Sequence, residues 1–183
     1  MRSDEDIVKE IVVERRHELF GMLYDRNSTR VYHKCISFSK DADDAKDMLH
    51  DVFLKTFANL SSFGERSSFS TWLYSITYNF CVDYARKKGK YRTQDVDEIG
   101  DIDDRQDEKN ESELMSIRAE RLGVVLDQID PKSKMLLLMK YQDGFSIKDI
   151  MEMMEIGESA VKMRVKRAKA QALDKYNELY KGT

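Results

Sequence analysis

The sequence predicts an all-α protein of two small helical domains joined by a flexible acidic linker, with a helix-turn-helix in the C-terminal domain. Of the 183 residues, only 8 are glycine and 1 is proline, while 36% are charged, so backbone breakers are scarce among good helix formers. Apolar residues recur at helical spacing in several segments. Residues 93–113 lack this spacing and are rich in acids, which is typical of a linker. We therefore expect domains at residues 1–92 and 114–183.

Four helices are expected in the first domain, at residues 4–24, 29–39, 41–60 and 69–88. Asp41 begins the third helix as an N-cap, and apolar residues follow it at helical spacing. Along the fourth helix, large apolar side chains gather on one face, which we expect to form the core: Phe69, Trp72, Leu73, Ile76, Phe80 and Tyr84. The side chains expected to face away from it are Ser75, Tyr78, Asn79, Val82 and Arg86.

The second domain is expected to open with two helices, at residues 113–129 and 132–141. Asp130 and Pro131 separate them, as an N-cap followed by proline at the first helical position. The second of these helices ends before the pair Asp143-Gly144.

The last third of the chain predicts two helices joined by a tight turn. Ser146 and Asp149 form a capping box at the start of the first helix. The second helix carries an apolar stripe of Val161, Val165, Ala168, Ala172, Tyr176 and Leu179. Basic residues lie mainly off this stripe, and such a pair of helices is typical of a DNA-binding helix-turn-helix.

The charges are unevenly distributed along the chain. The net charge is −3, yet residues 95–113 alone carry −8, which leaves +5 on the remainder. Bases cluster at residues 86–92 and again at residues 162–169. Two basic clusters that flank an acidic spacer indicate a polyanion contacted at two places. The alternative is that each cluster is merely a solvated surface.

The sequence gives little support to an enzyme. His17, His33 and His50 are scattered, no glycine-rich phosphate loop is present, and Cys35 and Cys81 lack the spacing of metal ligands. The longest purely apolar run has five residues, and no apolar region of a signal peptide follows the N-terminus. We expect a cytoplasmic protein with reduced thiols and with no metal, cofactor, catalytic residue or small-molecule substrate.

The helix at residues 69–88 carries residue types suited to unpaired bases. Tyr78 can stack on a base, Asn79 can bond a base edge, and Arg86 can hold a phosphate. An ordinary surface helix is the alternative interpretation of the same residues.

Two blocks of the sequence resemble one family. Residues 43–55 together with Phe69-Ser70-Thr71-Trp72-Leu73-Tyr74-Ser75-Ile76-Thr77-Tyr78-Asn79 resemble the first conserved domain of bacterial sigma factors. The block from residue 143 through residue 168 resembles the second domain. Because both occur in this order, the chain resembles a small extracytoplasmic-function sigma factor over roughly residues 17–92 and 114–178.

The resemblance implies roles for particular residues. The helix at 41–60 would dock on a coiled coil of core RNA polymerase through Asp47, His50, Asp51, Leu54 and Phe57. A base flipped from the minus-ten element would be held by Phe63, Gly64, Glu65, Arg66, Ser67, Ser75, Tyr78, Asn79 and Arg86. The minus-thirty-five element would be read by Lys162, Met163, Arg164, Lys166 and Arg167.

Some positions depart from the family pattern. His50 stands where glutamine is common, and Gly157 stands where serine or proline often begins the recognition helix. Ala160 and Met163 replace common hydroxyl residues, so the preferred minus-thirty-five sequence is expected to differ from the family average.

The resemblance thus implies a specificity subunit of RNA polymerase whose partners are the core enzyme, promoter DNA and an anti-sigma factor. The first alternative is a helix-turn-helix regulator that acts without the polymerase. The second is an interaction protein that titrates a regulator.

Overall fold

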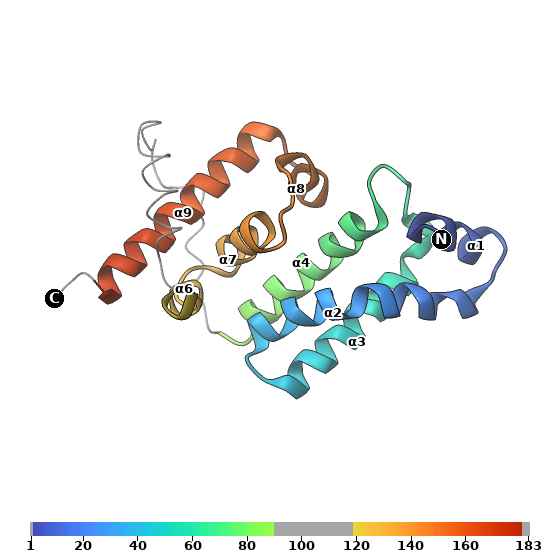
Figure 1. Cartoon of the computed structure of the whole chain (residues 1–183), viewed down its shortest axis with the longest axis horizontal. Coiled ribbons are helices and arrows are strands. Elements are labelled where there is room, and N and C mark those ends of the chain that lie inside the picture. Colours follow the sequence, from blue (N-terminus) through green and yellow to red (C-terminus); the bar gives the residue numbers. More distant parts are fainter. Residues whose placement is uncertain (1, 90–118, 181–183) are drawn as a thin grey trace. The chain divides into compact units, whose positions relative to one another are not determined.

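The computed structural model describes residues 2–89 and 119–180, and every regular element in these two ranges is helical (Figure 1). The all-α prediction is therefore confirmed. The described residues form two compact units, one containing α1 to α4 and the other most of the elements from α6 onwards. The predicted linker at residues 93–113 lies outside the described residues. No helix within them combines the length and apolar character needed to span a membrane.

The first unit contains α1 (Asp4–Val13), η1 (His17–Leu19), α2 (Phe20–Ser39), α3 (Ala42–Ala58), η2 (Leu60–Ser62) and α4 (Phe69–Lys87). Helices α2 and α3 pack side by side as a hairpin (Figure 1). The core joins residues from all four α-helices, including the fully buried Ile7, Leu23, Val52 and Leu73.

The predicted helix at residues 4–24 is wrong, because the chain turns after α1. Arg15 adopts a left-handed backbone with φ 57°, which a continuous α-helix does not allow. The helix α2 then begins at Phe20 and runs through the polar residues Asn27, Ser28 and Thr29, where we expected a break. Asn27 is buried, and its amide donates to the carbonyl of Leu23 and to Asp4. These tertiary contacts outweigh the weak helix propensity of this stretch.

The cap of α3 confirms the sequence prediction. The Asp41 carboxylate accepts hydrogen bonds from the backbone N–H groups of Asp43 and Asp44, both at 2.9 Å. Just before it, Lys40 takes a left-handed conformation with φ 61° and ends α2. The turn between α2 and α3 is thus fixed by contacts within residues 40–44.

The buried face of α4 is turned around the helix from the predicted one. Four residues expected in the core are only half-buried: Trp72, Ile76, Phe80 and Tyr84. Thr71, Thr77 and Val82 are buried instead, and Val82 was expected to face away from the core. The hydroxyl of Thr77 donates to the Leu73 carbonyl one turn earlier, so this polar group is satisfied inside the core. Counting only large apolar side chains therefore misplaced the core face.

The second unit contains α6 (Ala119–Leu126), α7 (Pro131–Leu137), the π-helical segment η5 (Leu138–Gln142), α8 (Ile147–Met154) and α9 (Glu158–Tyr180). Helices α6 and α7 pack against α9. Asp130 caps α7, with Pro131 at its first position, and Ser146 with Asp149 forms the capping box of α8, as predicted. Glu155 then takes φ 54°, and this left-handed residue ends α8 three positions before α9 begins at Glu158.

Candidate nucleic-acid interface

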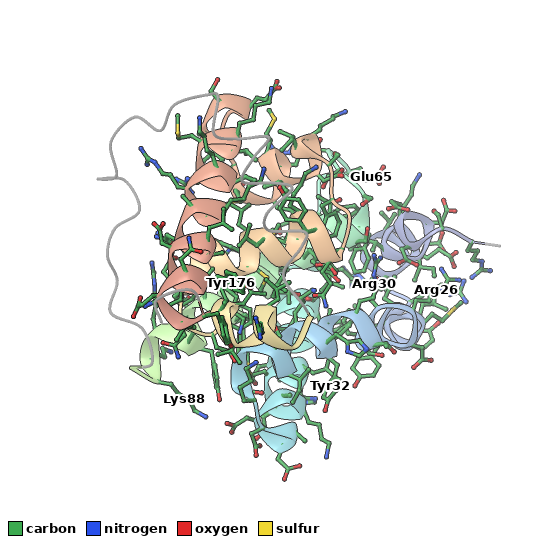
Figure 2. The ribbon with its side chains drawn as sticks, turned by 60° about the vertical axis from the view of Figure 1, so that its left-hand side comes forward. Arg26, Arg30, Tyr32, Glu65, Lys88 and Tyr176 are labelled. Carbon is green, nitrogen blue, oxygen red and sulfur yellow. The ribbon has the colours of Figure 1, made fainter. Side chains whose placement is uncertain are left out.

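The loop at residues 63–68 is fixed at both ends and exposed in between. At its start, the Phe63 ring lies 5.9 Å from that of Phe69 and 5.5 Å from that of Trp72. At its end, the hydroxyl of Ser68 accepts a hydrogen bond from the backbone N–H of Thr71 at 3.1 Å and thereby caps α4. Glu65 sits at the exposed centre with φ 52° (Figure 2). A loop anchored by its ends presents its middle residues in a defined place.

The exposed ridge of α4 carries part of the predicted minus-ten site. Asn79 and Arg86 are exposed, seven residues apart and therefore on one side of the helix. Ser75 is half-buried, and its hydroxyl donates to the Trp72 carbonyl at 2.7 Å. In the loop, Gly64, Glu65 and Arg66 are exposed, while Phe63 and Ser67 are half-buried.

Tyr78 corrects the sequence analysis, because it is buried and not outward. Only 8% of this residue is exposed. The reason is that the buried face of α4 is turned toward Tyr74, Tyr78 and Val82. The structure therefore offers Asn79, and not Tyr78, as the accessible side chain at this level of the helix.

The predicted polymerase-binding residues share one exposed face of α3. Asp47, His50 and Asp51 are exposed, and so are Leu54 at 54% and Phe57 at 42%. Their spacing of three or four residues repeats along the helix, which explains why the sequence could place them together. Large apolar side chains that remain exposed beside acids are typical of a binding surface.

The structure adds aromatic residues to this face that the sequence analysis missed. The ring of Phe57 lies 5.0 Å from that of Phe20 and 5.8 Å from that of His17, and Tyr24 packs on Phe53 at 4.6 Å. These residues come from η1 and α2, about 30 to 40 positions away in the sequence. Only the folded hairpin brings them beside α3, so no local pattern could reveal them.

In the helix-turn-helix, the first turn of α9 is the accessible part. Glu158, Ser159, Ala160 and Lys162 are exposed. The ammonium of Lys162 lies 2.7 Å from the carboxylate of Glu158, one turn earlier. The hydrogen bond from Lys162 and then its positive charge lower the pKa of Glu158 below the ordinary value of a glutamate. The Glu158 carboxyl group is therefore charged at neutral pH.

Lys166 is a second correction, since it was expected to face outward and is only 6% exposed. The buried side of α9 is wider than the predicted apolar stripe, because it also includes Lys166, Lys169 and Leu173. Lysine stems are four methylene groups long and can lie along a buried surface. The ammonium of Lys169 lies 5.7 Å from the centre of the Tyr141 ring. Met163, Arg164 and Arg167 are half-buried.

Comparison with known families decides the identity of the chain. Residues 23–91 match the model of Sigma-70 region 2, and residues 119–171 match that of Sigma-70, region 4. The first match covers α2, α3 and α4, and the second covers the helix-turn-helix. The chain belongs to the sigma-70 family. Both matches fall on the surfaces described above, in the order that a sigma factor requires.

Curated relatives refine the subfamily. This sigma-70 protein is 28% identical over 167 residues to ECF RNA polymerase sigma factor SigX of Bacillus subtilis (strain 168), covering 88% of this chain and 85% of SigX. It is 25% identical over 169 residues to ECF RNA polymerase sigma factor SigM of Mycobacterium tuberculosis (strain ATCC 25618 / H37Rv), covering 92% of this chain and 82% of SigM. The chain is an extracytoplasmic-function sigma factor.

Solved structures share its fold. CnrH, solved in complex with the cytosolic domain of CnrY, superposes with a TM-score of 0.67 at 19% identity, over 100% of both chains. The sigma factor RpoE of Bartonella quintana, solved with the anti-sigma factor NepR, superposes with a TM-score of 0.58 at 23% identity, over 89% of this chain and 97% of RpoE. The two-unit helical architecture is thus the fold of known sigma factors.

Proposed function

We propose that this sigma factor directs core RNA polymerase to promoters by dividing recognition between residues 1–92 and 114–183, joined by a linker at 93–113. The observation that carries the proposal is the presence of region 2 and region 4 matches on one chain, each on its own helical unit. An ordinary helix-turn-helix regulator needs only the second, so that alternative is not favoured.

The first unit binds the core enzyme and holds the melted minus-ten element. The face of α3 with Asp47, His50, Asp51, Leu54 and Phe57 contacts the polymerase, and its exposed apolar area supports this role. The loop at 63–68 together with Asn79 and Arg86 receives the flipped base and the adjacent phosphate. Tyr78 contributes to this site as packing support, because it is buried.

The second unit reads the minus-thirty-five element as duplex DNA. Lys162 meets a phosphate from the exposed first turn of α9, while Met163, Arg164 and Arg167 approach the base edges. Lys166 supports the helix more than it reads the sequence, because little of it is accessible.

This sigma factor has no catalytic role of its own, and it acts where the polymerase acts, in the cytoplasm. The chemistry of RNA synthesis belongs to the core enzyme. An anti-sigma factor is a further proposed partner. In support, RpoE of similar fold was solved in complex with the anti-sigma factor NepR.

Run-off transcription with purified core polymerase and a genomic promoter library tests the proposal. The protein should bind the core and produce transcripts from a limited set of promoters that share two short elements. If it binds promoter DNA alone but neither binds nor redirects the core, it is a regulator and not a polymerase subunit.

A further inference from the structure

The helix α1 lies outside the region 2 match, which begins at residue 23, yet it is part of the core of the first unit. Ile7, Val8 and Ile11 are all buried, with exposed fractions of 4% or less. This helix therefore does not trail from the domain. It occupies a fixed position against the other helices of the same unit.

One polar contact joins α1 directly to the start of α4. The carboxylate oxygen Oε1 of Glu5 accepts a hydrogen bond from the backbone N–H of Phe69 at 2.7 Å, across 64 residues of sequence. Phe69 is the first residue of α4, so its N–H has no partner within the helix. A carboxylate at this place also interacts favourably with the positive end of the helix dipole.

The residue that Glu5 holds is also the one on which the minus-ten loop packs. Phe69 is fully buried, and its ring contacts that of Phe63, the first residue of the loop. Ser68, directly before Phe69, closes the loop by capping α4. A shift of the Phe69 backbone would therefore displace both ends of the loop that carries Glu65 (Figure 2).

Glu5 is itself held in place by its neighbours in α1. Asp4 accepts hydrogen bonds from Arg26 at 2.7 Å and from Asn27 at 3.0 Å, and both donors belong to α2. Ser3 and Asp6 form the capping box of α1. Arg26 lies close to the start of α1, where its guanidinium also donates to the Arg2 carbonyl at 3.0 Å (Figure 2). The acceptor is thus mounted on a rigid element, as precise positioning requires.

We infer that Glu5 is a positioning residue for base capture, which fixes the first turn of α4 and with it the loop at residues 63–68. The inference rests on the proposed function, because the loop is assigned to the minus-ten element there. A region N-terminal to the family match would then set how fast the promoter is melted, without touching DNA.

The test compares Glu5→Ala with Glu5→Gln, and it uses Glu14→Ala as a matched control. Glutamine keeps an oxygen acceptor at the same reach, whereas alanine removes it. Glu14 is an exposed glutamate at the other end of α1. Open-complex formation by the holoenzyme is measured on a duplex promoter and on the same promoter with a pre-melted minus-ten region.

Glu5→Ala should slow opening of the duplex about tenfold, a factor near the lower end of what one hydrogen bond to a charged group contributes to an equilibrium. The defect should largely disappear on the pre-melted template, and Glu5→Gln should restore most of the rate. Equal defects on both templates, or equal behaviour of Glu5→Ala and Glu14→Ala, would overturn the inference.

A second readout needs no polymerase. Trp72 is the one tryptophan in the sequence, and it packs on Phe63. Acrylamide should quench its fluorescence more strongly in Glu5→Ala than in Glu5→Gln or the wild type, at a temperature well below the unfolding transition of all three proteins. Unchanged quenching would refute the inference even if the protein initiates transcription. If the wild type failed to redirect the polymerase while quenching changed as expected, the proposed function alone would fall.

Discussion

Replacing Lys162 with alanine tests directly whether α9 contacts promoter DNA. Of the five residues expected to read the minus-thirty-five element, Lys162 is the most exposed, with 64% of its side chain accessible. Its partner Glu158 lies one turn earlier on the same helix, and exposed pairs of this kind contribute little to folding. The substitution should therefore leave the unfolding transition unchanged and act on DNA binding alone.

The expected magnitude follows from counterion release. Losing one phosphate contact lowers the slope of log affinity against log salt by about 0.9. Between about 50 and 200 mM salt, the loss of affinity caused by Lys162→Ala should consequently shrink by about three- to fourfold. Fluorescence anisotropy of the holoenzyme on a labelled promoter duplex, titrated at several salt concentrations, measures this slope.

Glu158→Gln should have the opposite effect, because it removes a carboxylate that competes with phosphate for Lys162. Affinity should rise at low salt, and the gain should vanish when Lys162 is already alanine, since neighbouring substitutions are not additive. Lys175→Ala provides the control. Lys175 also pairs with a glutamate, Glu178, at 2.6 Å, but it lies 13 residues further along α9. An unaltered salt slope in Lys162→Ala, or the same change in Lys175→Ala, would refute the phosphate contact.

Three further predictions concern the rest of the molecule. Asn79→Ala should slow open-complex formation on duplex promoters about tenfold and have less effect on pre-melted ones. The reason is that the Asn79 side chain is exposed and can hold a flipped base without supporting the fold. Equal effects on both templates would point to damaged folding. Leu54→Asp together with Phe57→Ala should weaken binding to the core polymerase at least tenfold in a pull-down titration, while far-ultraviolet circular dichroism stays unchanged. Asp127→Ala should destabilise the second unit by about 1–3 kcal/mol in urea denaturation, because it removes the carboxylate that lies 2.8 Å from the buried ammonium of Lys134. Lys134→Met should cost less, because it removes the buried charge itself.

Local chemistry explains which parts of the fold could be predicted from the sequence. The caps at Asp41, Asp130 and Ser146 depend on backbone groups two or three residues away, so a short pattern contains all that is needed. The face of α3 was also predictable, since its apolar spacing is regular. The resemblance to sigma factors then supplied the roles, which no spacing rule could provide.

The errors came from contacts between distant segments. Asn27 continues α2 because Asp4, 23 residues earlier, receives its amide hydrogen bond. Burial of Tyr78 and Lys166 was missed because the buried faces of α4 and α9 were placed from their apolar stripes alone, without the helices that pack against them. The contact of Glu5 with Phe69 had no signal in either local segment. In each case the deciding partner becomes adjacent only after the chain has folded.

The two cysteines provide built-in reporters of how the first unit opens. The sequence has only Cys35 and Cys81, which lie in α2 and α4, and both are 0% exposed. A thiol reagent can modify them only when these helices separate, so the labelling rate measures the free energy of that opening. The second unit carries no thiol and stays silent. The stability of the first unit can thus be followed within the intact chain, free or bound to the polymerase, without introducing any label site.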